Sequence, residues 1–153
     1  MNREQERFRS VGVFLLRAAL GAYYLMHAYY VGYVVGIGPM AQFNASHGIP
    51  FPATVAWFIL LGHGLGGAML LAGYYTRLGA LVNLVIVSGA VIFVHRTQGF
   101  FMTGIIINAK QGQAITGGYE FTLLLAIATL VVLFLGSGPL ARKSAKPSRI
   151  SLD

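Results

Sequence analysis

The stretch PATVAWFILLGHGLGGAMLLAGYY, residues 52–75, decides the fold class of this protein. A helix that crosses a bilayer needs about 20 mostly apolar residues, and this stretch contains a single ionisable side chain, His63. Gly62 and Gly66 are four positions apart, a spacing that lets two membrane helices approach closely. We therefore predict a transmembrane helix here, packed against a neighbour through its glycine-bearing face.

Three further apolar stretches have the length of transmembrane helices: residues 11–35, 78–95 and 118–136. Their ionisable members are few, namely Arg17 and His27 in the first, His95 at the end of the second and Glu120 at the start of the third. The sequence therefore predicts an all-α integral membrane four-helix bundle over residues 11–138. A basic amino-terminal segment (1–10) precedes it, and a basic tail (139–153) follows it.

The overall composition agrees with a membrane protein. Of the 153 residues, 56% are hydrophobic and only 10% are charged, whereas a soluble domain typically carries about 25% charged residues. This excludes a soluble enzyme, a disordered tail and a nucleic-acid-binding domain. The sequence has no cysteine, which excludes disulfide frameworks, thiolate metal sites and iron–sulfur clusters.

The basic residues predict the orientation of the bundle. Three precede the first span, Arg77 lies in the short turn after the second, and four follow the last span. The two remaining connections hold only Arg96 and Lys110. Because cytoplasmic connections carry the excess of Lys and Arg, we predict that both termini are cytoplasmic.

The connections differ in character. Residues 36–51 are uncharged apart from His47 and contain several glycines and prolines, which predicts a turn-rich or partly re-entrant loop. Residues 76–77 predict a tight turn between the second and third spans. Residues 97–117 form the longest connection, and their apolar clusters at 100–102 and 105–107 are expected at the lipid headgroup boundary.

Ionisable side chains inside a membrane are costly, so they usually face the bundle interior and find partners. A rise of 1.5 Å per residue along each span predicts one level near the outer boundary for four ionisable residues: His27, His95, Arg96 and Glu120. It predicts that His63 lies near the midplane and Arg17 toward the inner edge. The tyrosines beside His27 are typical of an interfacial belt. The candidate ligand-binding or quinone-binding residues are His27, His63, His95, Arg96, Glu120 and Arg17.

Two other uses of these residues stay open. Glu120 is the only internal acidic residue, so an Arg96–Glu120 pair that joins the outer ends of the last two spans is an alternative to a ligand pocket. Histidines on facing helices can hold a b-type haem, and His27 with His95 and Glu120 could hold a metal. Neither His27 nor His95 has a histidine partner four residues along its own helix, so we expect no metal site and no intrinsic cofactor.

The order and spacing of several short motifs resemble the DoxX family of small four-helix membrane proteins over residues 10–138. The motifs are LRAALG (16–21), HGIPFP (47–52), GGAMLLAG (66–73), YTR (75–77), GFF (99–101) and GGYE (117–120). Relatives usually carry an acidic residue where this chain has His63. The resemblance implies a bacterial or archaeal plasma-membrane protein, related to the small subunits of terminal quinol oxidase and thiosulfate:quinone oxidoreductase. The positions that match the family pattern are Arg17, Gly21, His27, Gly48, Pro50, Gly67, Arg77 and Glu120.

From these observations we expect a quinone-interacting or accessory subunit of a membrane redox complex, with a polar pocket near the outer face. The chain offers no electron carrier of its own, so it is not expected to be a complete oxidoreductase. Expected partners are the bilayer, a redox protein and further copies of this chain, but not nucleic acid. The alternatives are a non-catalytic membrane anchor or assembly partner, and a small-solute transporter, which would require oligomers because four helices rarely enclose a pore.

Overall fold

The structure is a computed structural model that describes residues 2–102, 105–108 and 113–138, with the side chains of 105–108 and 113–116 left aside. Its long helices are α1 (Arg3–Tyr29), α3 (Pro52–Ala72), α4 (Thr76–Gly89) and α5 (Glu120–Leu135). A π-helical turn extends α1 (η1, Tyr30–Val35), and a π-helical turn and a 3₁₀ turn extend α4 (η2, Ala90–His95; η3, Arg96–Gln98). Two shorter elements, α2 (Ile37–Ser46) and a hairpin of β1 (Ile105–Asn108) and β2 (Gln113–Thr116), lie in the connections.

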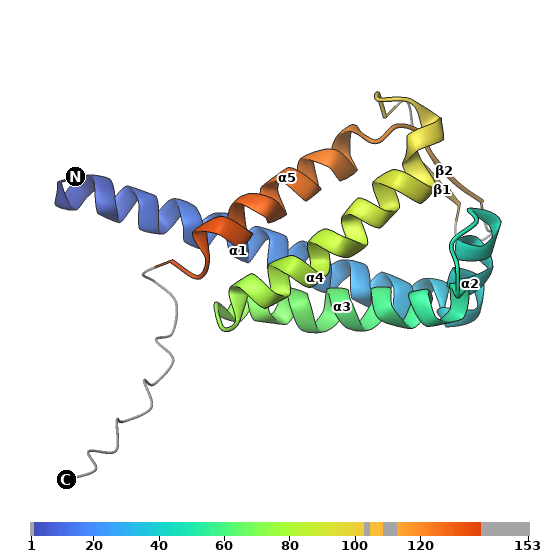
Figure 1. The fold of residues 1–153 in the computed structure, drawn as a ribbon, viewed down its shortest axis with the longest axis horizontal. Helices are drawn as coiled ribbons and strands as arrows, with labels where there is room; N and C mark the ends of the chain where they lie inside the picture. Colours follow the sequence, from blue (N-terminus) through green and yellow to red (C-terminus); the bar gives the residue numbers. More distant parts are fainter. Residues whose placement is uncertain (1, 103–104, 109–112, 139–153) are drawn as a thin grey trace, which may run out of the picture.

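The four long helices form one bundle. Helix α1 packs against α3 and α5, α3 packs against α4, and α4 packs against α5, so each helix has two neighbours (Figure 1). The core joins Leu20 and Tyr24 of α1, Leu70 of α3 and Val132 of α5. This confirms the predicted all-α membrane bundle, whereas the side of the membrane on which the termini lie stays a prediction.

Three helical segments are long and apolar enough to cross a membrane: Arg3–Val35, Pro52–Ala72 and Thr76–Gln98. Helix α5 is apolar but has only 16 residues, which at 1.5 Å per residue spans about 24 Å. The first helix begins earlier than the predicted span because Asn2 and Gln5 form a reciprocal capping box that satisfies two amides of its first turn.

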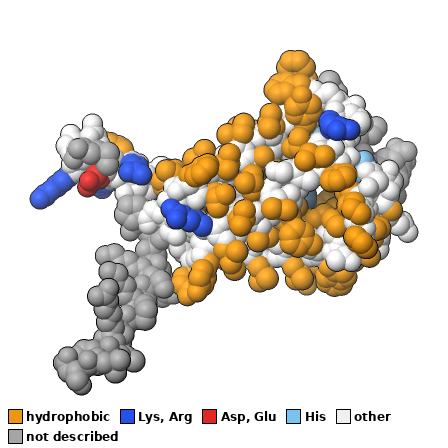
Figure 2. All heavy atoms as spheres, viewed as in Figure 1, with side chains coloured by type: hydrophobic (Ala, Val, Ile, Leu, Met, Phe, Trp, Pro, Cys, Tyr) orange, Lys and Arg blue, Asp and Glu red, His pale blue; other side chains and the backbone are white. Residues whose placement is uncertain are grey.

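The surface and the interior have the polarity expected in lipid. Figure 2 shows hydrophobic side chains over most of the visible face of the bundle, and few charged ones. The buried side chains, in contrast, include Arg17, His63, Asn83 and Thr129. Because hydrocarbon cannot satisfy polar groups, this distribution is the one expected of a membrane protein.

Glycines set the distances between helices, as predicted for residues 62 and 66. A Cβ atom on Gly66 would lie 3.1 Å from the carbonyl oxygen of Gly79 on α4, and one on Gly62 would lie 2.5 Å from the side chain of Ile86. On a neighbouring face of α3, a Cβ atom on Gly67 would lie 3.0 Å from the carbonyl oxygen of Gly21 on α1. Helix α3 therefore uses one face for α4 and another for α1.

The connection 36–51 differs from the prediction, because most of it forms helix α2. The predicted breakers lie at the start of that helix. Gly36 adopts φ +83° as its N-cap residue, and Pro39 falls in the first turn, where a missing amide costs nothing. Buried Asn44 then donates from Nδ2 to the carbonyl oxygen of Pro52, which ties α2 to the start of α3.

The long connection 97–117 contains the antiparallel hairpin β1–β2, which was not predicted. Phe100 and Phe101, whose side chains are described, are exposed. The structure does not describe the side chains of the predicted cluster at 105–107, nor residues 139–153 of the predicted basic tail.

Candidate functional site

A polar layer crosses the interior of the bundle and takes one buried side chain from each long helix. These are Tyr24 of α1, His63 of α3, Asn83 of α4 and Thr129 of α5. Each of them is at most 4% exposed. Buried polar groups in lipid require partners, and the four are bonded in two pairs that cross between helices.

The first pair joins α3 to α4. The Nδ1 atom of His63 lies 2.6 Å from Oδ1 of Asn83, and Nδ2 of Asn83 donates to the carbonyl oxygen of Gly79 at 2.8 Å. Since the amide nitrogen is committed to Gly79, the amide oxygen is the acceptor for His63. His63 therefore carries a proton on Nδ1, and in the neutral ring Nε2 is an acceptor.

The second pair joins α1 to α5. The hydroxyl groups of Tyr24 and Thr129 lie 2.6 Å apart, and Thr129 donates to the carbonyl oxygen of Leu125 at 2.7 Å. A hydroxyl has one proton, so Tyr24 donates to Thr129. The ring of Tyr24 also stacks on His63, with centroids 5.0 Å apart and planes 8° apart, so the two pairs form one layer.

His27 lies beside this layer and is half-buried. Its ring centroid lies 5.0 Å from that of His63, at an interplanar angle of 83°, and Tyr23 stacks on it at 6.3 Å. Within the described part of the chain, no hydrogen bond engages either ring nitrogen of His27. Both ring nitrogens of His27 can thus bond to a further molecule, whereas Nδ1 of His63 is already bonded to Asn83.

The contact of His27 with His63 corrects the depths predicted from helical rise. The prediction placed His27 near the outer boundary and His63 near the midplane, but their rings are in contact. The physical reason is that the packing of the two helices, with Gly21 against Gly67, sets the axial offset of α1 against α3, whereas the prediction assumed an entry point for each span separately. Tyr24 is likewise wrongly assigned to an interfacial belt, since its side chain is 0% exposed.

Arg17 lies apart from the histidines, at the carboxyl end of α3. Its Nη1 atom donates to the carbonyl oxygens of Leu70 at 2.7 Å and Leu71 at 3.0 Å. These carbonyls belong to the last turn of α3, where the only other donor printed for them is the Gly73 amide, 3.3 Å from the carbonyl oxygen of Leu70, and this turn carries the negative end of the helix dipole. A buried guanidinium therefore finds its compensation in backbone, with the ring of Phe14 5.2 Å away.

Arg77, which matches the family pattern, caps the carboxyl end of α5 in the same way. Its Nη2 atom donates to the carbonyl oxygen of Phe134, in the last turn of α5, at 3.3 Å. Next to it, Gly136 adopts φ +69°, just as Gly73 adopts φ +73° beside Arg17. Two arginines thus cap two helices, each beside a glycine of positive φ.

Glu120 has a local partner. Its Oε1 atom accepts the backbone amide of Met102 at 2.9 Å, and its own amide donates to the carbonyl oxygen of Phe100. His95 bonds through Nδ1 to Gln98 on the following 3₁₀ turn, and Arg96 is exposed. Over the described ranges no ion pair joins Arg96 to Glu120, and no hydrogen bond links His95, Arg96 or Glu120 to His27 or His63.

The six predicted site residues are therefore not gathered into one group. The structure brings the rings of His27 and His63 into contact, whereas the hydrogen bonds of Arg17, His95 and Glu120 go to other partners. In the part of the chain that is described, no three His, Asp or Glu side chains lie close enough to hold a metal.

An open groove runs between α1–η1 and α3, and neither His27 nor His63 lines it. It has a volume of about 510 Å³ and is lined mainly by apolar atoms of Ala28, Tyr29, Gly32, Tyr33, Leu60, Leu61, Gly64 and Leu65. Small residues form its floor, because a Cβ atom on Gly64 would touch that of Ala28 at 3.7 Å. Tyr29 and Tyr33 stack on each other at 5.3 Å and form one wall.

Several members of the polar layer were not singled out from the sequence. Thr129 was missed, although it is one of two hydroxyl residues in α5, and Tyr24 was attributed to the membrane boundary. The sequence carries only a weak signal for Tyr24 and Thr129: each is a polar residue among apolar ones, and the packing of the helices decides which group it bonds to.

Comparison with known proteins identifies the family. The family model described as DoxX matches residues 12–96, which is more than half of the 153 residues. Neither the curated proteins nor the solved structures contain a match to this chain. The matched range holds most of α1 and all of α3 and α4, with Arg17, the histidine pair and Asn83, and the chain therefore belongs to the DoxX family.

Proposed function

We propose that this DoxX-family membrane protein is a quinone-interacting accessory subunit of a redox complex in a bacterial or archaeal plasma membrane, with both termini cytoplasmic. The observation that carries the proposal is the half-buried imidazole of His27, packed against His63 and Tyr23 without a hydrogen-bond partner of its own among the described residues.

The chemistry of a quinone head suits such a group. A quinone carbonyl needs a hydrogen-bond donor, and reduction of the quinone requires the uptake of protons. Imidazole exchanges protons near neutral pH, so a histidine can supply both. His27 has both ring nitrogens available, whereas His63 is held through Nδ1 by Asn83. His27 is therefore the group proposed to contact the carbonyl, and His63 is the group that fixes its position.

The groove between α1–η1 and α3 supports a ligand with a long apolar tail. Its lining includes Ala28 and Gly64, the residues that directly follow His27 and His63 in sequence. Sites for small ligands are typically apolar with a few convergent polar groups. We propose that an isoprenoid tail lies in this groove.

The role is that of an accessory subunit because the sequence supplies no cysteine for an iron–sulfur cluster. Electrons would reach a quinone here from a separate redox protein, which is the partner that the proposal requires.

Quinone extraction from purified protein tests the proposal. Full-length protein is purified in mild detergent, its lipids are extracted with solvent, and isoprenoid quinone per protein is measured by mass spectrometry. We expect His27→Phe to lose most of the quinone and His95→Phe to retain it, because His95 bonds only within its own turn among the described residues. Equal quinone content in both variants, or none in the unsubstituted protein, would refute the site.

A second candidate, a non-catalytic anchor or assembly partner, is favoured by one specific observation. His63, Asn83, Tyr24 and Thr129 bond to one another across four helices, which is sufficient to explain their burial as packing. A protein that carries no quinone but co-purifies with a stable companion in mild detergent would support this role.

A further inference from the structure

Phe51 and Tyr75 combine a strained backbone with an exposed aromatic side chain. Among the described residues other than glycine, these two alone have a positive φ, which is 50° in each. The left-handed region favours glycine, because a Cβ atom crowds the backbone there. Phe51 is restricted further by Pro52, which follows it. A side chain kept at such a position is expected to make a contact that compensates for the strain.

Neither ring finds that contact inside the protein. The side chain of Phe51 is 79% exposed and that of Tyr75 is 61% exposed. Over the described residues, no aromatic ring stacks on Phe51, and the ring beside Tyr75 is that of Tyr74, which is exposed as well. The partner of both side chains therefore belongs to the surroundings of the molecule.

The two residues lie at opposite ends of helix α3. Phe51 directly precedes α3, and Tyr75 follows its last turn and directly precedes α4. Figure 1 shows α2 at one end of α3 and the turn to α4 at the other. The 21 residues of α3 span about 32 Å at 1.5 Å per residue, and the hydrocarbon core of a bilayer is about 30 Å thick. Phe51 and Tyr75 are therefore separated by the thickness of one hydrocarbon core.

The surface of α3 between these two residues suits hydrocarbon. Trp57, Leu61 and Leu65 are exposed, and their spacing of four residues puts them on one face of the helix. His63, the ionisable residue of α3, is buried. Aromatic side chains favour the boundary between acyl chains and headgroups. An exposed aromatic residue at each end and an apolar face between them are typical of a helix that crosses the bilayer along its whole length.

We propose that Phe51 and Tyr75 anchor the two ends of α3 in the two lipid interfaces, with their rings between acyl chains and headgroups. His63 then lies near the middle of the bilayer, because it is about 17 Å from the start of α3 and about 14 Å from its end. The ring of His27 is in contact with that of His63 and shares this depth. This differs from the pocket near the outer face that the sequence predicts.

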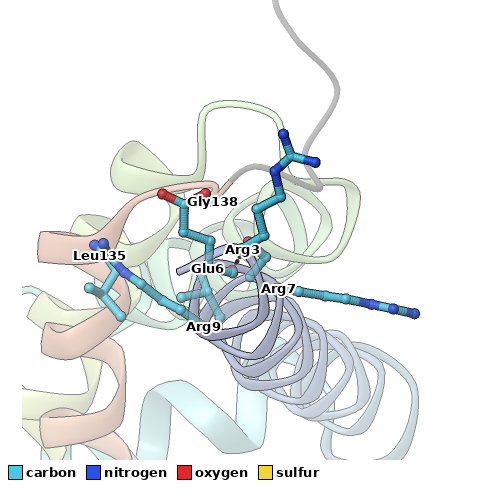
Figure 3. Close-up of a pocket in the computed structure, with 8 residues that line it drawn as sticks. Arg3, Glu6, Arg7, Arg9, Leu135 and Gly138 are labelled. Atoms are coloured by element: carbon cyan, nitrogen blue, oxygen red, sulfur yellow. Dashed lines mark hydrogen bonds between the residues drawn. The ribbon is translucent and has the colours of Figure 1, made fainter. Parts of the chain in front are cut away.

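The charged residues at the start of α1 agree with this placement. Figure 3 shows Arg3, Glu6, Arg7 and Arg9 around the start of the helix, where all four are exposed. Along α1, Arg9 is about 27 Å from His27 at 1.5 Å per residue, whereas half of the hydrocarbon core is only about 15 Å. With His27 near the middle of the bilayer, these charges lie outside the hydrocarbon, as their solvation requires.

The depth also restricts the class of ligand that reaches the histidine pair, a consequence that rests on the proposed quinone site. A charged group is costly to bury at the centre of a bilayer, so an ionic solute or a phospholipid headgroup is disfavoured there. A quinone head is neutral and is joined to an apolar tail. The ligand is therefore a neutral molecule that enters from the hydrocarbon.

Depth-dependent fluorescence quenching tests the proposal, because Trp57 is the single tryptophan of the chain. Full-length protein is reconstituted in phosphatidylcholine vesicles whose acyl chains carry bromine either near the headgroup or near the bilayer centre. Three further proteins combine Trp57→Phe with Phe51→Trp, Tyr75→Trp or Met26→Trp. Met26 is exposed and adjoins His27, so it reports the depth of the histidine pair.

The two positions of bromine should give opposite orders of quenching. We expect bromine near the headgroup to quench Phe51→Trp and Tyr75→Trp more strongly, and bromine near the centre to quench Met26→Trp more strongly. The unsubstituted protein is the control, since Trp57 lies about 8 Å from the start of α3 and should respond between these extremes. The thermal unfolding midpoint of each variant verifies that the fold is intact.

Equal or stronger quenching of Met26→Trp by bromine near the headgroup would overturn the proposal. Stronger quenching of Phe51→Trp or Tyr75→Trp by bromine near the centre would overturn it as well. Quinone content, measured on the same preparations, separates this proposal from the proposed function. A deep Met26→Trp in a protein without quinone supports the depth and refutes the quinone site alone, whereas a shallow one in a protein that carries quinone refutes the depth alone.

Discussion

The guanidinium of Arg17 caps the carboxyl end of a helix 53 residues away in sequence, through a hydrogen bond of 2.7 Å from Nη1 to the carbonyl oxygen of Leu70. The charge is 2% exposed and has no acidic partner among the described residues. Its compensation comes from the backbone carbonyls at the end of α3. This relationship explains an arginine inside an apolar helix without a ligand.

We predict that Arg17→Ala destabilises the bundle, because the carbonyl of Leu71 loses its side-chain donor and that of Leu70 keeps only the long bond from the Gly73 amide at 3.3 Å. The loss of a buried bond to a charged group costs about 1–3 kcal/mol. The midpoint of thermal unfolding in detergent should fall accordingly. A midpoint equal to that of the unsubstituted protein would show that water or detergent satisfies these carbonyls.

Gly73→Ala should also destabilise the protein, for a steric reason. Gly73 adopts φ +73°, and an added Cβ atom would lie 2.5 Å from Nη1 of Arg17. The matched control is Gly12→Ala on α1, which has no atom within 4 Å of the added methyl group. Its expected effect is a small stabilisation, about 0.5–1 kcal/mol, because alanine is the better helix former. Equal unfolding midpoints of Gly73→Ala and Gly12→Ala would show that close packing against Arg17 does not stabilise the turn after α3.

The bond between His63 and Asn83 should appear as an energetic coupling. His63→Phe leaves the amide oxygen of Asn83 without its donor, and Asn83→Leu leaves the Nδ1 proton of His63 without its acceptor. The double variant removes both groups together, so its destabilisation should be smaller than the sum of the single effects. Interhelical polar pairs in membranes give coupling energies of about 0.6–1.7 kcal/mol. Strict additivity in a double-mutant cycle would argue against the bond.

Glu120 is predicted to hold the connection 99–102 against the start of α5. Glu120→Ala removes the acceptor of the Met102 amide, so hydrogen exchange of that amide should accelerate about tenfold, the equivalent of one hydrogen bond. Glu120→Gln keeps an oxygen at the same position and serves as the control, with exchange close to that of the unsubstituted protein. Acceleration in both variants would point to the negative charge rather than to the acceptor.

The sequence alone determined the fold class. Whether a stretch can cross a bilayer depends on its length and polarity, which are local properties, so the apolar stretches, the bundle and the close approach at Gly62 and Gly66 were all predictable. The helix at Ile37–Ser46 was not, because Gly36 and Pro39 are compatible with a helix start as well as with a turn. The capping roles of Arg17 and Arg77 could not be predicted either, because their acceptors are backbone carbonyls, which every residue has.

Only the tertiary structure decided which polar groups meet. The contact of His27 with His63 depends on the axial shift and rotation of α1 against α3, which the close approach of Gly21 to Gly67 sets. A count of residues from an assumed entry point fixes neither quantity. The same rigid packing directs Tyr24 to Thr129 and leaves Glu120 with Met102. The length of an apolar stretch is a property of consecutive residues, whereas the partners of buried polar groups depend on how the helices pack against one another.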